Sequence, residues 1–225
     1  MRRTVGAAGV AGLLLAGAVG CGAWGQQHRT VSYEVPGQVT ELVVTGDAGG
    51  IEVRAGDGPA QVVEKRSWSG DTEPQAAHSL ADGVLKLSYS CSGSGCGMGY
   101  QVRVPAGTKL RLTQGSGGIR LHGMAGDIEA KVDSGGIDAD GLRARGVRLT
   151  VGSGGLDAGF TEAPDRAELS TGSGGLKLKV PAGAQYQVDA HADSGGTDVT
   201  VPSAAGAPHV LVARVGSGGL KVTTG

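Results

Sequence analysis

The chain has 225 residues, of which 44 are glycine, 39% are hydrophobic and only 3% are aromatic. No glycine-every-third pattern accompanies this high glycine content, which excludes a collagen triple helix. Charged residues make up 18% and the net charge is only −1, so the composition argues against a disordered chain and gives no electrostatic basis for binding nucleic acid. With so few aromatic side chains, any core has to be thin and aliphatic.

The first 20 residues resemble a secretory signal peptide. Two arginines follow the initial methionine, and an apolar stretch over residues 5–19 comes next. This stretch is too short, and too rich in glycine and alanine, for a membrane-spanning helix of ~20 residues. We therefore predict a signal peptide over residues 1–20.

The apolar stretch ends in Ala18-Val19-Gly20-Cys21, which resembles the lipobox of bacterial lipoproteins. In a lipobox the cysteine thiol accepts a diacylglycerol before the signal peptide is cleaved. We expect a lipid on Cys21, a tether over residues 21–30 and an extracytoplasmic protein anchored to the bacterial cell membrane. The alternative is ordinary signal cleavage after Ala18, which would leave Cys21 as a free thiol.

The other two cysteines, Cys91 and Cys96, form an even pair if Cys21 carries lipid. They lie in a Gly/Ser-rich segment between two strand-like stretches, residues 84–89 and 100–104, which could bring them within bridging distance. In the oxidising space outside the cytoplasm we expect a disulfide between them rather than a redox pair or a metal site. The five histidines are scattered, so no metal and no cofactor is expected.

We expect residues 31–105 to form an irregular β-region. Several short stretches alternate apolar and polar residues, as strands do, and longer connections separate them. We expect this region to cap one end of the repeats that follow, since the open end of a stacked β-structure is a bare edge. The strand-like stretches are 31–35, 39–44, 51–53, 61–68, 84–89 and 101–104.

A repeated motif dominates residues 106–225. It reads Gly- or Asp-Ser-Gly-Gly followed by an apolar or threonine position, and it occurs six times at intervals that lengthen from 18 to 23 residues. An outlying copy with alanine in place of serine ends at Gly50. Apolar and polar residues alternate before and after the copies, and no segment has a convincing helical period. The glycine pairs are Gly117-Gly118, Gly135-Gly136, Gly154-Gly155, Gly174-Gly175, Gly195-Gly196 and Gly218-Gly219.

These repeats predict an all-β fold, a β-solenoid similar to a single-stranded β-helix, with residues 31–225 forming one continuous domain. A rung of 18–23 residues explains why one turn sequence recurs at nearly one spacing. Each glycine pair is a structural turn, either a corner of the solenoid or a hairpin loop. If it is a corner that needs a positive φ or a close approach, Gly155→Val in the middle of the array should destabilise more than Gly219→Val near the chain end.

The segment Val104-Pro105-Ala106-Gly107 before one copy, and Val180-Pro181-Ala182-Gly183 before another, resemble the bacterial "putative adhesin" domain family of unknown function. The resemblance covers roughly residues 40–225. It implies a β-helical envelope protein that often carries a signal peptide or a lipid anchor. It supplies no catalytic residues.

The position two after each glycine pair is charged, and stacked corners would line these positions up on the outer face. We expect a solvated face with weak ion pairs. The alternative is that Asp138, Asp140 and Asp157 form a carboxylate cluster for Ca²⁺ or for sugar hydrolysis. The charged residues are Arg120, Asp138, Asp157, Lys177, Asp198 and Lys221.

The sequence thus predicts a non-enzymatic cell-envelope lipoprotein with an adhesin-like, binding or structural role. Its expected partners are membrane lipid through Cys21 and a cell-wall polymer, surface polymer or protein. The alternative function is a polysaccharide-active β-helix enzyme that uses the carboxylates near Asp138 and Asp157. A third possibility is an accessory of an envelope-stress sensor.

Overall fold

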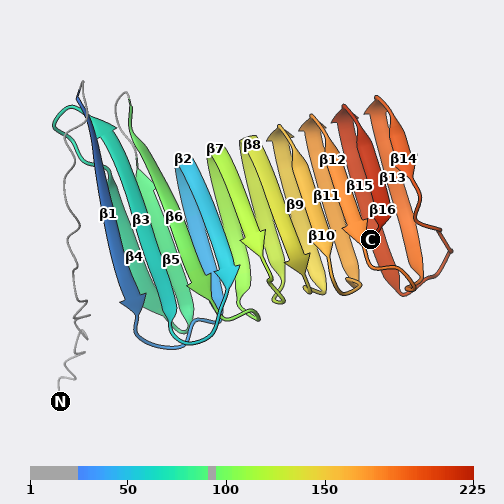
Figure 1. Ribbon diagram of the computed structural model, residues 1–225, viewed down its shortest axis with the longest axis horizontal. Coiled ribbons are helices and arrows are strands. Elements are labelled where there is room, and N and C mark those ends of the chain that lie inside the picture. The colour runs from blue at the N-terminus through green and yellow to red at the C-terminus, as the bar shows by residue number, and fades with distance from the viewer. Residues whose placement is uncertain (1–24, 91–94) are drawn as a thin grey trace, which may run out of the picture.

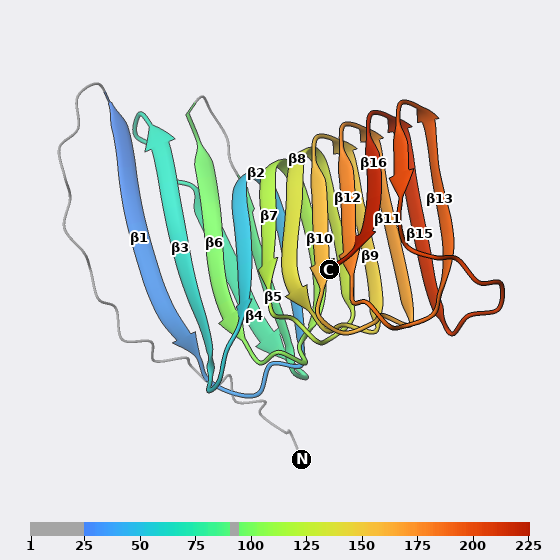
Figure 2. The same ribbon diagram turned by 45° about the vertical axis from the view of Figure 1, so that its right-hand side comes forward.

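The computed structural model describes residues 25–90 and 95–225, and within these every regular element is a β-strand. The strands stack side by side into an elongated solenoid, with β1 at one end and β13 and β14 at the other (Figure 1, Figure 2). Each rung is a length of chain that folds back at a corner, so its two arms belong to two sheets facing each other. The predicted all-β solenoid is confirmed.

We name the two sheets by the direction of the chain: the upstream sheet holds the arms that lead into a corner, and the downstream sheet holds the arms that leave it. Three long strands bend at the corner and enter both sheets: β2 (Glu41–Ala55), β7 (Lys109–His122) and β8 (Ile128–Leu142). The upstream sheet also contains β4 (Gln75–Ala81), β5 (Val84–Ser90), β9 (Gly146–Ser153), β11 (Arg166–Ser173), β13 (Tyr186–Ser194) and β15 (His209–Ser217). The downstream sheet also contains β1 (Gln26–Val35), β3 (Ala60–Ser69), β6 (Gly97–Val104), β10 (Leu156–Phe160), β12 (Leu176–Val180), β14 (Thr197–Val199) and β16 (Leu220–Thr224). The pairs are parallel, except β1–β3, β3–β6 and β4–β5.

The core lies between the two sheets and follows from the alternation of side chains along each arm. Leu149 in β9 and Leu169 in β11 are partners in register and both are buried. Arg148 and Glu168, one position earlier, are also partners and lie on the outer surface. Burying a leucine contributes ~1.5–3 kcal/mol, so repeated columns of aliphatic side chains stabilise the solenoid with few aromatic residues.

The first glycine of each pair forms the corner. Seven such glycines have a φ between 118° and 139°, a region that side chains rarely adopt. A Cβ on Gly154 would overlap the carbonyl oxygen of Gly135 in the neighbouring rung, and the other six would meet a neighbouring carbonyl in the same way. Backbone conformation and rung spacing therefore both require glycine here. The seven are Gly49, Gly117, Gly135, Gly154, Gly174, Gly195 and Gly218.

The second glycines are less constrained: none has a positive φ, and the tightest contact, of a Cβ on Gly136, would be 3.0 Å from the carbonyl oxygen of Gly155. Gly155 and Gly219 do not have a positive φ, and a Cβ on either would meet no atom within 4 Å. The premise behind Gly155→Val, that this glycine needs a positive φ or lies close to the next rung, is therefore wrong. The steric constraint falls on Gly154, one position earlier.

The order of the rungs in space differs from their order in the chain at the C-terminal end. The rung made of β15 and β16 lies between that of β11 and β12 and that of β13 and β14. Gly219 lies near the chain end but is therefore in an inner rung with neighbours on both sides, so a substitution there would not disturb one neighbour only. The chain crosses over in residues 200–208, within the longest interval between two motif copies.

The N-terminal region is more regular than predicted. Residues 26–30, which we expected in a tether, form the first half of β1 and pair with β3. β2 is itself a complete rung with its corner at Gly49, and it pairs along its length with β7. The solenoid therefore begins well before residue 106, because β2 already carries the alternation and the glycine pair of a rung. No helix in residues 25–90 or 95–225 has the length and apolarity to cross a membrane.

Candidate functional site: the outer face of the downstream sheet

The charged positions after the glycine pairs form one continuous row across the outer face of the downstream sheet. Each residue is the register partner of the next, from β7 through β8, β10, β12 and β16 to β14. Parallel strands lie about 4.8 Å apart, so neighbouring charges in the row are within interaction distance. The equivalent position on β2 is Glu52, the register partner of Arg120, which continues the line beyond β7. We call the six residues from β7 to β14 the charge row; in spatial order it is Arg120, Asp138, Asp157, Lys177, Lys221 and Asp198.

The spatial order changes the charge pattern that the sequence suggested. Stacking in chain order gives one pair of like-charged neighbours, Asp138 and Asp157. The crossover of the last rungs brings Lys221 beside Lys177, which creates a second such pair. The row therefore has a positive residue, two negative residues, two positive residues and a final negative one.

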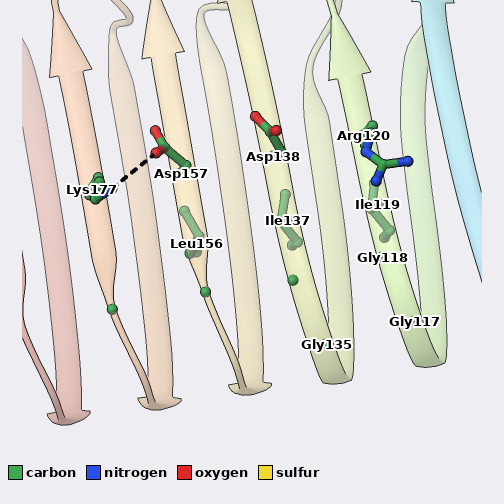
Figure 3. Close-up of a pocket in the computed structure, with 13 residues that line it drawn as sticks. Gly117, Gly118, Ile119, Arg120, Gly135, Ile137, Asp138, Leu156, Asp157 and Lys177 are labelled. Atoms are coloured by element: carbon green, nitrogen blue, oxygen red, sulfur yellow. Dashed lines mark ion pairs between the residues drawn. The ribbon is translucent and has the colours of Figure 1, made fainter.

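A shallow groove of about 610 Å³ runs beside the charge row (Figure 3). Its floor includes second glycines such as Gly136 and Gly155, and its charged side is formed by Arg120, Asp138 and Asp157, with Lys177 at one end. The groove exists because the second glycines leave the space next to the row free of side chains. Further hollows continue it toward β14 and toward β6.

The ion pairs along the row are loose and exposed. Lys177 and Asp157 are 3.9 Å apart, with 70% and 59% of their side chains exposed. Lys221 and Asp198 are 3.2 Å apart and similarly exposed. Such pairs contribute ~0.2–1 kcal/mol each, so the row adds little to stability. Within the described part of the chain, Arg120 takes part in no ion pair.

The three carboxylates of the alternative enzyme hypothesis do not lie together in one cluster. Asp138 and Asp157 are register partners, but Asp140 lies one outward position further along β8, where its carboxylate contacts His122 Nδ1 at 2.5 Å. Across residues 25–90 and 95–225, no three His, Cys, Asp or Glu side chains converge as metal ligands would. The pair of aspartates lies on an open face rather than in an enclosed pocket.

Sequence reasoning missed a buried polar cluster at the β1 end. The Glu64 side chain is only 2% exposed; the Tyr33 hydroxyl donates to its carboxylate at 2.9 Å, and Arg66 forms an ion pair with it at 2.5 Å. Burial raises the pKa of Tyr33 above its ordinary value, and the negative charge of Glu64 raises it further. The signal was present in the sequence, because Glu64 occupies an inward position in the alternation of β3.

Two predicted sites depend on residues outside the described ones. Cys21, the proposed lipid site, and Cys91, one half of the proposed disulfide, both lie there. Cys96 lies immediately before β6. The lipid on Cys21 and the Cys91–Cys96 bridge therefore stay predictions.

Comparison with known proteins supports the fold and identifies the family. A putative cell adhesion protein from Clostridium sporogenes is similar in structure at 10% identity, with a TM-score of 0.50, over 88% of this chain and 100% of the other. A putative adhesin from Bacteroides fragilis is similar at 15% identity, with a TM-score of 0.50, over 88% of this chain and 97% of the other. No curated protein matches the chain in sequence. The Toastrack DUF4097 family matches residues 37–209, and the chain belongs to this family.

Proposed function

We propose that this protein is a cell-envelope lipoprotein that displays a non-catalytic β-solenoid for adhesin-like binding, with the outer face of the downstream sheet as its contact surface. The single observation that carries the proposal is the charge row beside a glycine-floored groove. Six exposed charged residues are held in register on a rigid sheet, where they contribute little to stability. The adhesin descriptions of the two similar structures agree with a binding role.

The proposed anchor fits the position of the N-terminal end. Cys21 lies five residues before Gln26, the first residue of β1. An extended chain of that length reaches at most about 18 Å, so a lipid on Cys21 would hold the β1 end of the solenoid close to the membrane. The charge row lies on the opposite half, from β7 to β14, and would be presented away from the anchor (Figure 1).

An adhesion assay tests the proposal on cells that display the full-length chain. Neutralising the row with Asp138→Asn, Asp157→Asn, Lys177→Gln and Lys221→Gln should abolish attachment to surfaces coated with envelope material from the same bacterium. Unchanged attachment would contradict the proposal. The matched control neutralises two acidic and two basic residues on the outer face of the upstream sheet, and it should leave attachment intact: Arg111→Gln, Glu129→Gln, Arg148→Gln and Glu168→Gln.

A further inference from the structure

The charge row is complementary to itself. When the row is reversed end for end, every charge meets its opposite: Arg120 faces Asp198, Asp138 faces Lys221, and Asp157 faces Lys177. This property depends on the crossover of the last two rungs. In chain order Arg120 would face Lys221, and Asp138 would face Asp198, so two of the three pairs would repel.

We infer that the outer face of the downstream sheet binds the same face of a second copy of this protein, in an antiparallel arrangement. This inference rests on the proposed function and names its partner. A two-fold axis parallel to the strands, between β10 and β12, reverses the row and brings each charge opposite its complement. Glu52, next to Arg120 on β2, then lies beyond the edge strand β14 of the other copy and faces no residue of the row. Such a contact is isologous, since the same surface serves both copies. It gives Arg120, which has no ion pair in the described part of the chain, a carboxylate partner in Asp198 of the other copy.

The neighbouring positions on the face permit this contact. One outward position further along the strands, Asp140 would face Thr223 and Lys179 would face Gly159, so no like charges oppose each other there. The second glycines carry no side chain, which allows the two sheets to approach closely beside the row. Charge and shape on this face are therefore both compatible with a second copy.

The size of the contact indicates a weak complex. Six strands at about 4.8 Å spacing, with arms of about five residues at ~3.3 Å each, give on the order of 500 Å² per partner. That area is at the low end of specific interfaces, among transient complexes. Because the contacts are exposed ion pairs, the association should weaken as the Debye length shortens from ~30 Å at 0.01 M salt to ~8 Å at 0.15 M.

The geometry also places the two anchors. In the antiparallel arrangement the strands β7 to β14 overlap, while β1, β3, β6 and β2 of each copy extend beyond the contact at opposite ends (Figure 2). The two β1 ends, and with them the proposed lipids, therefore point away from each other. Copies in this arrangement bridge two opposing membranes rather than pair within one, which makes the contact a homophilic adhesive one.

Vesicle clustering tests the inference with the full-length lipidated chain in phosphatidylcholine vesicles. Wild-type vesicles should cluster at low salt and disperse at high salt. Vesicles carrying Asp138→Lys with Asp157→Lys should fail to cluster, because every facing pair at the centre of the row is then positive. Vesicles carrying Lys177→Glu with Lys221→Glu should fail for the opposite reason. Mixing the two variants should restore clustering, since all four facing pairs are again opposite in sign.

Two controls separate this contact from general attraction between oppositely charged vesicles. Glu129→Lys with Glu168→Lys, and Arg111→Glu with Arg148→Glu, produce the same changes in net charge on the upstream sheet. Each of these variants alone should cluster like the wild type at low salt, and mixing them should add nothing. Thermal melting of each variant confirms that it is folded.

Three results would overturn the inference: wild-type vesicles that stay dispersed at low salt, row variants that cluster alone as well as the wild type, or a mixture of the two row variants that stays dispersed. If wild-type vesicles stay dispersed while cell attachment still depends on the charge row, the proposed function stands and its partner is a different molecule. If cell attachment does not depend on the charge row either, the proposed function and the inference of a contact between two copies both fail.

Discussion

Lys177 and Lys221 lie side by side in register on β12 and β16, although a complete rung containing Asp198 separates them in the chain. The rung of β15 and β16 lies beside the rung of β11 and β12, and the rung between them in sequence, that of β13 and β14, lies at the outer edge of the solenoid. A surface made of stacked repeats therefore cannot be read from the order of the repeats alone. Its charge pattern depends on which rungs are neighbours in space.

The two glycines of one corner should respond differently to substitution. Gly154→Ala places a Cβ at a φ of 138° and against the carbonyl of Gly135, so we expect a loss of at least ~1–2 kcal/mol in unfolding free energy. Gly155→Ala, with open space around its Cβ, should cost less than about 1 kcal/mol and serves as the matched control. Urea denaturation of the two variants measures the difference, and equal losses would refute this description of the corner.

Corners at the edge and inside the array should also differ. A Cβ on Gly218 would overlap the carbonyl of Gly174, and this rung is held between two others. A Cβ on Gly195 would overlap the carbonyl of Gly218, but among the described residues no strand pairs with the outer side of its rung. Ser203 and Ala204 hold only the start of β13 there, so the corner at Gly195 can move outward. We expect Gly218→Ala to lower the melting temperature more than Gly195→Ala. A larger effect at Gly195 would show that the edge rung is not free to relax.

Much of this fold could be predicted because its signals are local. The alternation that buries Leu149 and exposes Arg148 has a period of two residues, and a glycine pair marks the turn of each rung. Repetition then assembles such local units into rungs. The charge row was also visible in the sequence, because its members occupy one fixed position after each glycine pair.

The remaining features depend on contacts between distant parts of the chain. The crossover of the last two rungs places Lys221 next to Lys177, and nothing local to either lysine encodes it. The pairing of residues 26–30 with β3 spans about 40 residues and extends a strand into a segment that resembles a tether. The choice of Gly154 over Gly155 as the constrained glycine depends on the neighbouring rung, whose position the sequence does not give.

The buried cluster at the β1 end predicts a large effect of removing one cation. Arg66→Met would leave the carboxylate of Glu64, which is 2% exposed, without its ion-pair partner, and we expect a loss of roughly 3–5 kcal/mol in unfolding free energy. Arg29→Met is the control: Arg29 pairs with Glu73 at the exposed rim of the same cluster and should cost less than about 1 kcal/mol. Similar losses in both variants would mean that the Glu64 charge is solvated.

The proposed lipid anchor gives a test that does not involve the fold. Cys21→Ser removes the thiol that would carry the diacylglycerol. The mature lipidated form should then disappear from the membrane fraction, and the chain should be found either as an unprocessed precursor or as shed soluble protein. Cys96→Ser should remain in the membrane fraction and is the control. Cell fractionation locates the variant, and the intact mass of the wild-type chain shows whether it carries lipid. A Cys21→Ser variant that stays in the membrane fraction, together with a wild-type mass that contains no lipid, would exclude the anchor.

The buried tyrosines predict that alkaline pH destabilises the protein. Burial raises the pKa of Tyr100 and of Tyr33 above the ordinary value of 10.0, and the Glu64 carboxylate raises both further. Below pH 10 these tyrosines are neutral in the folded and the unfolded chain, so they cause no pH dependence there.

Above pH 10 the unfolded chain loses phenolic protons that the folded chain retains, so the free energy of unfolding should fall by about 1.4 kcal/mol per pH unit for each such tyrosine. Tyr100→Phe keeps most of the buried ring and removes one titrating group, so its stability should fall less steeply over the same range. Urea denaturation at a series of pH values on both sides of 10 measures the two slopes. Identical slopes for Tyr100→Phe and wild type would show that Tyr100 ionises equally in the folded and the unfolded protein.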